Sequence, residues 1–439
     1  MKPLPLFLCS LSILNFLRAE PPKSSGEDDA VSAPSLAAIT QAAVADNPSI
    51  KEARAKWEAM KQRVPQAAAW DDPKVSANTR VGRFVDISRN GFTDQMLSVE
   101  QMIPISGKNR SRERIAAAEA LGALEDVRRK ELDVIVRVRA AWFHLVRDYA
   151  LLELNRSDES LLSQTVEVAR ARLAVGQQGQ ADVLTAQNEM NRLEEARHDL
   201  LRTLSEDTTQ LQVLMNRDPF APLSRPATEA APAYAHFSDG ELRAALLRNR
   251  PELRSAEAGI TAAKARLELA RRDWIPDPTL SLEAQRYNGA SQVVSELDAA
   301  VSFSVPWLNG RKYRAEESEA RKGVEAAQQK LESSRAEALG MLRDQLQKIE
   351  TLHHHIELFR DRLIPTAHET VQTNRTNYEN GRIGFLELVL SERNLRELEG
   401  MLQQHVSDYH VAVAELEAVV GVDPGPLSSH HEAGKGGAK

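Results

Sequence analysis

The sequence predicts a mainly α-helical chain that also carries four β-strands, arranged as two similar halves. Three observations predict this fold class. Short motifs recur at one spacing, four segments alternate between apolar and polar residues, and two helical segments are far longer than a compact domain needs.

Motifs of the first half return in the same order in the second half. Asn47-Pro48 is matched by Asn249-Arg250-Pro251, and Trp70 is matched by Trp274. The proline before each long helical segment and the glycine turn after it also recur, with all spacings between 202 and 205 residues. We therefore predict a first structural repeat at residues 20–217, a linker at 218–238 and a second repeat at 239–421.

The two ends of the chain fall outside these repeats. Lys2 followed by the apolar stretch from Leu4 to Leu17 predicts a secretory signal peptide at residues 1–19. An ordinary N-terminal helix and lipid attachment at Cys9 are the alternatives. The tail, residues 422–439, is rich in Gly and is predicted to be disordered.

Composition excludes several classes of function. The 439 residues include 56 basic and 63 acidic ones, a net charge of −7, so no basic excess favours nucleic-acid binding. Cys9 is the single cysteine, so the mature chain has no disulfide and no cysteine nucleophile. No phosphate-binding loop, zinc-protease motif or nucleophile elbow is present, which predicts a protein that is not an enzyme and has no cofactor.

Each half has the same order of predicted elements. The first half has a helix at 36–69, strands at 74–82 and 95–103, a long helix at 108–175 and a helix at 182–217. The second half has a helix at 240–274, strands at 279–287 and 296–305, a long helix at 311–377 and a helix at 387–420.

The predicted strands are apolar on one face only. Leu280 and Leu282 share a face, and Ser281 and Glu283 share the opposite one. Their length of roughly nine to eleven residues spans a bilayer when a strand is tilted. Two soluble hairpins packed on helices are the alternative. Four strands cannot close a barrel, so several chains would have to contribute strands to one barrel if the strands lie in a membrane. Three copies would give a barrel of twelve strands.

The helices have lengths that fit together. At about 1.5 Å per residue each long helix measures about 100 Å. The short helices 36–69 and 182–217 together have 70 residues against 68 in the long helix 108–175, so two short rods stacked end to end match one long rod. An apolar stripe with coiled-coil spacing runs along 339–363, and Pro365 is expected to bend the second long helix.

In this order the motifs resemble the TolC-like outer-membrane efflux protein family over residues 36–421. The resemblance is carried by Pro104 with Gly107-Lys108, by Pro306 with Gly310-Arg311, and by the turn at 175–184 with its counterpart at 380–388. It implies a homotrimer with a twelve-stranded barrel in the cell outer membrane. An α-helical coiled-coil barrel would extend from it as a tunnel into the periplasm. A periplasmic adaptor and an inner-membrane efflux transporter are the implied partners, and heavy-metal cations or small toxic compounds are the implied substrates. The stretch from Gly107 to Arg110 is similar to the CzcC-like cation-efflux branch. A periplasmic adaptor and a coiled-coil scaffold are the alternative functions.

The resemblance also implies functional residues at the two turns. Asp182 and Glu387 match acidic positions at the family's pore entrance, and Arg382 would lock the closed state. The implied adaptor-contact tip consists of Val175, Gly176, Gly179, Gly381 and Gly384. Complementing the helix dipole is the alternative role of the two carboxylates, and a solvated charge is the alternative for Arg382. Leu390 replaces a further acidic residue of the family.

Histidines 353–355 form a triplet within the second long helix. Consecutive helical residues point in different directions, so one metal ion cannot bind all three, and a solvated helix face is the favoured interpretation over metal contact.

Overall fold

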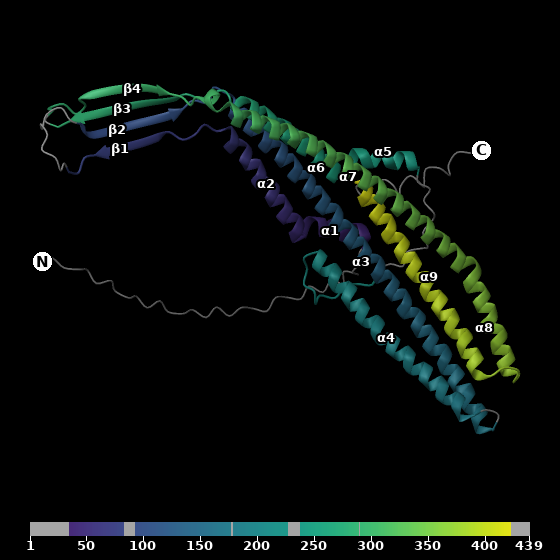
Figure 1. The fold of residues 1–439 in the computed structure, drawn as a ribbon. Coiled ribbons are helices and arrows are strands. Elements are labelled where there is room, and N and C mark those ends of the chain that lie inside the picture. The colour runs from purple at the N-terminus through teal and green to yellow at the C-terminus, as the bar shows by residue number, and fades with distance from the viewer. Residues whose placement is uncertain (1–34, 83–92, 177–178, 227–237, 289, 423–439) are drawn as a thin grey trace, which may run out of the picture.

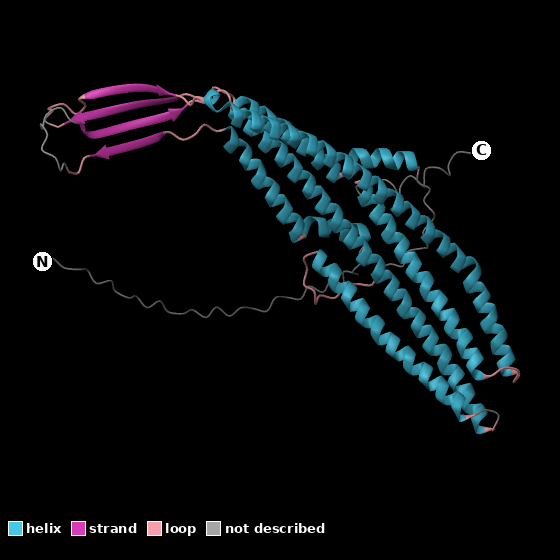
Figure 2. Cartoon of the chain, in the orientation of Figure 1, coloured by secondary structure: helices cyan, strands magenta, loops and turns pink. Residues whose placement is uncertain are grey.

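The computed structural model describes residues 35–82, 93–176, 179–226, 238–288 and 290–422. The predicted signal peptide, residues 227–237 of the predicted linker and residues 423–439 of the tail lie outside the described residues. A four-stranded sheet occupies one end of the molecule, and long helices extend from it to the other end (Figures 1 and 2).

The first half contains both of its predicted strands and one helix more than predicted. Its helices are α1 (Leu36–Asp46), α2 (Pro48–Ala68), α3 (Lys108–Ala174) and α4 (Gln180–Leu214). Its strands are β1 (Lys74–Thr79) and β2 (Thr93–Met102). The prediction of one helix over 36–69 is therefore wrong. Asn47 ends α1, and its side chain accepts a 2.9 Å hydrogen bond from the N–H of Ser49, while Pro48 begins α2.

The second half repeats this order with two interruptions. Its elements are α5 (Asp239–Asn249), α6 (Pro251–Arg272), β3 (Thr279–Tyr287), β4 (Glu296–Ser302), the 3-10 turn η1 (Pro306–Asn309), α7 (Gly310–Leu358), the π-helical turn η2 (Phe359–Leu363), α8 (Ile364–Glu379) and α9 (Phe385–Val420). The single helix predicted at 240–274 breaks at Arg250-Pro251. The bend expected at Pro365 takes the form of η2, because a π-helical turn absorbs the strain that the proline introduces.

The helices pack in the arrangement that their lengths predict. The short helices α2 and α4 lie one after the other along α3, whose 67 residues span about 100 Å (Figure 1). Helices α6 and α9 pack on the other side of α3 and also contact α7, so the two halves form one layer of helices. Its apolar clusters include Trp142 and Leu145 of α3 and Leu416 of α9, which are almost fully buried.

The two hairpins join into one antiparallel sheet with the order β1-β2-β3-β4. Val99 pairs with Val75 on one side and Leu282 on the other, which places these apolar side chains on one face. The opposite face carries Ser98, which pairs with Glu283, and Glu283 in turn pairs with Asp298. The sheet therefore has one apolar and one polar face, and β1 and β4 form its two edges.

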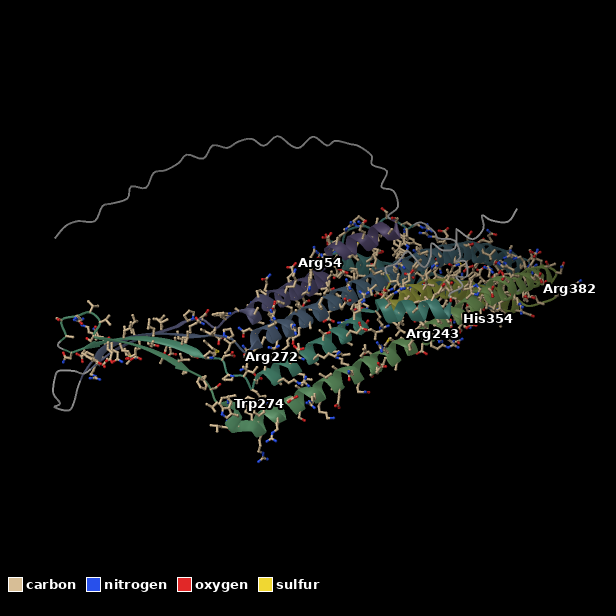
Figure 3. All side chains as sticks on the ribbon, turned by 90° about the horizontal axis from the view of Figure 1, so that it is seen from above. Arg54, Arg243, Arg272, Trp274, His354 and Arg382 are labelled. Atoms are coloured by element: carbon tan, nitrogen blue, oxygen red, sulfur yellow. The ribbon has the colours of Figure 1, made fainter. Side chains whose placement is uncertain are left out.

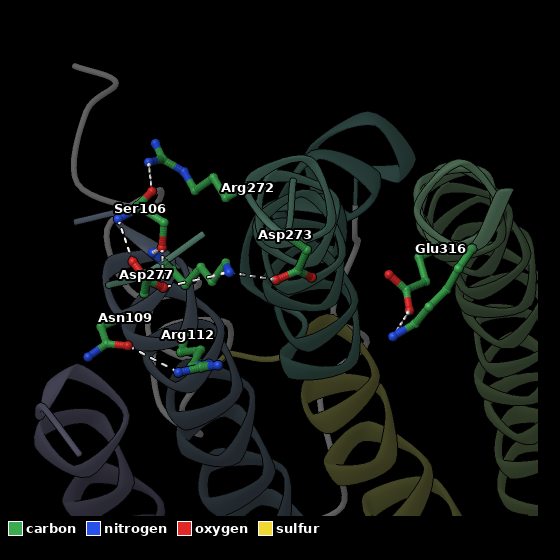
Figure 4. A network of polar contacts seen from close by, with 9 residues as sticks. Ser106, Asn109, Arg112, Arg272, Asp273, Asp277 and Glu316 are labelled. Atoms are coloured by element: carbon green, nitrogen blue, oxygen red, sulfur yellow. Dashed lines mark hydrogen bonds and ion pairs between the residues drawn. The ribbon is translucent and has the colours of Figure 1, made fainter. Parts of the chain in front are cut away.

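A polar network fixes the junction between sheet and helices (Figure 4). The backbone N–H and the hydroxyl of Ser106 donate to the two carboxylate oxygens of Asp277 at 2.8 and 2.7 Å. Lys108 Nζ lies 3.6 Å from Asp277, and Arg272 donates to the Ser106 carbonyl at 3.0 Å. Burial alone would raise the pKa of Asp277, yet the Ser106 hydrogen bonds hold that pKa below its ordinary value. Gly107 adopts φ +73°, and a Cβ there would lie 2.5 Å from the Arg272 guanidinium, so this turn requires glycine.

Among the described residues, no helix is both long enough and apolar enough to cross a membrane.

Candidate functional site

Two helix–turn–helix tips lie at the end of the rods farthest from the sheet (Figure 1). One joins α3 to α4, and the other joins α8 to α9. Gly176 and Gly381 both have φ +71°, the left-handed conformation that ends a helix. At the second tip the Gly381 N–H donates to the Tyr378 carbonyl at 3.0 Å and the Arg382 N–H donates to the Asn377 carbonyl at 2.8 Å. These glycines reverse the chain at each tip.

The predicted acidic residues occupy equivalent positions in the two tips. Gly179 and Gly384 are extended and directly precede α4 and α9, and neither helix has a side-chain cap. Asp182 and Glu387 are each the third residue of their helix, where a negative charge complements the helix dipole. Asp182 is half-buried and Glu387 is exposed, and neither forms an ion pair with another described residue. The structure thus fits the dipole-complementing role of both carboxylates.

The tips pack against each other through a shared apolar cluster. Its buried members are Val166, Ala169, Val183, Ala186, Tyr378, Phe385, Leu388 and Val389. These residues come from α3, α4, α8 and α9. The rings of Tyr378 and Phe385 meet edge to face, with their centroids 5.8 Å apart. The cluster holds the two tips of one chain together.

Arg172 connects the two tips and was not predicted from the sequence. It lies in the last turn of α3, and its guanidinium donates to the carbonyls of Tyr378 at 2.9 Å and Glu379 at 2.8 Å, at the end of α8. Its Cζ also lies 4.5 Å from the centre of the Tyr378 ring. These carbonyls lie at the negative end of the α8 dipole, so a cation that donates to them is favoured both by hydrogen bonding and by the dipole.

The other predicted tip residues lie at the surface. The Arg382 side chain is exposed at the end of the rods (Figure 3) and forms no ion pair within the described part of the chain. Its lock with a carboxylate therefore stays a prediction. Val175 is 68% exposed at the end of α3, beside Gly176. The first turns of α4 and α9 expose Leu184 and Leu386. The tips thus present apolar side chains to the outside.

Arginine–carboxylate pairs tie α9 to the first half of the chain above the tips. The pairs are Arg393 with Glu189, Arg396 with Asp158, and Arg139 with Glu417. A fourth pair, Arg147 with Asp207, joins α3 to α4 within the first half. The carboxylates of Glu189 and Glu417 are almost fully buried. Such pairs fix which helices meet, because a buried carboxylate that loses its arginine is left without a compensating charge.

In two of these carboxyls the pKa is raised to about 6. Burial raises the pKa of Asp158 to about 6, against the opposing effect of Arg396. Burial and the neighbouring Asp148 raise the pKa of Asp207 to about 6 as well. Protonation of either group is thus easier in the folded chain than in the unfolded chain, where the ordinary value is 3.8.

We expect Asp158→Asn to stabilise the protein above pH 7 and to have little effect near pH 4. A carboxyl with a raised pKa contributes stability that is present below its unfolded value and is lost as the pH rises through about 6. Asparagine stays neutral at every pH and avoids that loss. Above pH 7 the variant should therefore gain about 1 kcal/mol in free energy of unfolding, after partial solvent screening. Thermal unfolding measured from pH 4 to 8 tests this. The exposed Asp126→Asn on the same helix is the control, and a pH-independent effect of Asp158→Asn would contradict the assignment.

Comparisons with known proteins agree with this arrangement. The sequence model of a family described as outer membrane efflux protein matches residues 39–217 and 242–422. The probable efflux pump outer membrane protein SepC of Pseudomonas putida is 29% identical over 220 residues, or 47% of this chain and 45% of SepC. The solvent efflux pump outer membrane protein SrpC of Pseudomonas putida is 24% identical over 64% of this chain and 63% of SrpC. The chain thus spans about half the length of SepC and under two thirds of SrpC. The solved structure of the outer-membrane channel OprN has a TM-score of 0.76 at 18% identity, over 88% of this chain and 90% of OprN.

Proposed function

Since this chain belongs to the outer membrane efflux protein family, we propose that it is the outer-membrane channel of a tripartite efflux system. It serves as a passive exit duct and carries out no chemistry of its own. The observation that carries this function is the two-faced sheet at one end of an elongated layer of helices. The sheet suits a membrane wall, and the helices suit a tunnel that reaches away from it.

The sheet supports a location in the outer membrane. Its apolar face is open in the single chain, where Val75 is 66%, Leu297 62% and Val301 63% exposed. An apolar face of this kind is stable against lipid, and the polar face with Glu283 and Asp298 is suited to a water-filled pore.

The edges of the sheet support a homotrimer. Strands β1 and β4 are the edges of the four-stranded sheet, and an unpaired strand edge is not tolerated in lipid. Three copies that pair β4 of one chain with β1 of the next form a closed barrel of twelve strands. Their helices then enclose the coiled-coil tunnel in the periplasm.

The tips support contact with the remaining components of the system. We assign the adaptor-contact tip to Val175, Gly176, Gly179, Gly381 and Gly384, as the sequence predicts. The exposed apolar residues beside them, Leu184 and Leu386, add the kind of surface that a partner protein covers. A periplasmic adaptor would bind there, and an inner-membrane transporter would supply the energy.

Small toxic organic compounds are the substrates we favour. SrpC is described as part of a solvent efflux pump, and its identity to this chain supports this choice. The CzcC-like branch, and with it heavy-metal cations, is the second candidate and rests on the stretch from Gly107 to Arg110. Three of those residues have structural roles here. Gly107 and Lys108 build the junction, and Asn109 donates to the Ala69 carbonyl at 2.7 Å. Deleting the gene for this protein and comparing growth in the presence of solvents with growth in the presence of metal salts distinguishes the two substrate classes.

Current through the purified protein in a planar bilayer tests the channel and its gate. We expect the double variant Asp182→Asn/Glu387→Gln to lower the preference for cations over anions roughly several-fold, because six carboxylates of a trimer would lie near the narrow end of the tunnel. Glu194→Gln/Glu397→Gln, on the same helices but three turns from the tips, is the control. No current from the wild type would refute the channel, whereas an unchanged ion preference in the first variant would refute only the gate.

A further inference from the structure

Packing separates the three histidines of the triplet. His354 is exposed on the outer surface of α7 (Figure 3). His353 Nδ1 lies 3.7 Å from the Glu357 carboxylate. His355 faces α9, where its ring lies 4.9 Å from the ring of His405 between centroids. One histidine of the triplet therefore meets a second imidazole, which is distant in the sequence.

Both facing imidazoles have a nitrogen that lacks a partner. Nδ1 of His355 and Nδ1 of His405 are shielded from solvent, and neither has a hydrogen-bond partner among the described residues. A buried polar atom without a partner is unfavourable, and here two such atoms belong to rings in contact with each other. A bound ligand that accepts both lone pairs would remove that cost.

We propose that His355 and His405 form a binding site for a divalent transition metal ion of the zinc type, which bridges α7 and α9. An imidazole nitrogen binds zinc at about 2.0 Å, which places the ring centre roughly 3.2 Å from the ion. Two such rings at a near-tetrahedral angle have centroids about 5 Å apart. The observed 4.9 Å matches this spacing.

The chemistry of the pair suits such an ion. Burial lowers the pKa of His405, and the neighbouring His355 lowers it further. The His405 ring is therefore neutral at pH 7, and its lone pair is available to a metal ion. Imidazole is a preferred ligand of Zn²⁺, Ni²⁺ and Cu²⁺. The described residues include no group of three or more His, Cys, Asp or Glu that could hold a metal. Water therefore completes the coordination, and the ion remains exchangeable.

The site lies beside the bend of the second long helix. The His405 ring also meets Phe359, the first residue of η2, edge to face at 5.1 Å. An ion held by His355 and His405 would fix α7 to α9 about one turn before η2. This inference stands apart from the proposed efflux function, because it concerns binding alone.

Equilibrium dialysis of the purified full-length, untagged protein against Zn²⁺ tests the site. All samples carry His430→Ala/His431→Ala, which removes the histidines of the tail. We expect one zinc ion per chain, retained in His354→Gln and lost in both His355→Gln and His405→Gln. Bound Co²⁺ should give a visible spectrum that the latter two variants lack.

Unchanged stoichiometry in His355→Gln and His405→Gln would overturn the site, as would an equal loss in His354→Gln. X-ray absorption of the Zn²⁺-loaded protein without the site substitutions remains decisive if the site variants fail to fold. Two imidazole nitrogens per zinc support the proposal, and fewer than two refute it.

Discussion

Replacing Arg172 with alanine is expected to increase the open fraction of the proposed channel by about 30-fold. The guanidinium makes two charge-assisted hydrogen bonds, to the Tyr378 and Glu379 carbonyls at the end of α8. Together they contribute about 2 kcal/mol to the contact between the two tips, once their partial exposure is considered. The alanine variant loses both bonds, which leaves the Glu379 carbonyl to water and the Tyr378 carbonyl with its bond from the Gly381 N–H alone. Single-channel recordings in a planar bilayer measure the open fraction directly.

A neighbouring arginine provides the control for this prediction. Arg170 lies on the same turn of α3, but it pairs with Glu167 of its own helix at 2.8 Å, so Arg170→Ala should not change the open fraction. Arg172→Lys keeps the positive charge but cannot form the same bidentate hydrogen bonds. We therefore expect an open fraction between those of the wild type and Arg172→Ala. If Arg172→Ala opens no more often than the wild type, the contact between the tips does not control opening.

Replacing Arg139 with alanine is expected to destabilise the protein by about 3–5 kcal/mol. Arg139 of α3 pairs with Glu417 of α9, whose side chain is only 5% exposed. Burial raises the pKa of Glu417 against the opposing effect of Arg139, so without the arginine its carboxylate would be buried with no compensating charge. Chemical denaturation of the detergent-solubilised protein at pH 7.5 gives the free energy of unfolding.

Two further variants distinguish the effect of an uncompensated buried charge from the effect of lost packing on stability. Arg139→Met combined with Glu417→Leu removes both charges and should recover most of the stability. Arg54→Ala breaks the exposed pair with Glu131 and should cost less than about 1 kcal/mol. A loss below 1 kcal/mol in Arg139→Ala would mean that water reaches Glu417 in the assembled protein.

Local patterns accounted for the class of almost every element. The alternation of Leu280 and Leu282 with Ser281 and Glu283 predicted β3, since a strand exposes its two faces to different surroundings. The predicted long helix 108–175 corresponds to α3 within one residue at its end. The glycine turns marked both tips, since only glycine adopts the left-handed conformation without a steric cost.

The prolines that break the two predicted helices 36–69 and 240–274 are visible in the sequence. Pro48 and Pro251 each begin a helix, and the residue before a proline disfavours the α conformation. Both prolines recur between the two halves, while the helical periodicity across them predicts one continuous helix in each half. Local backbone sterics outweighed periodicity at both positions.

The sequence alone determined the class of the elements, their order and the glycines that turn the chain at the tips, because these depend on conformational preferences and on contacts between near neighbours. Only the tertiary structure decided how the two hairpins join through β2 and β3, that Arg172 caps α8, and that His355 meets His405. These pairings connect residues 50 to more than 200 positions apart, and no local pattern specifies which distant partner a side chain meets. The burial of apolar surface between α3, α6, α7 and α9 fixes the register of the rods, and that register selects the partners.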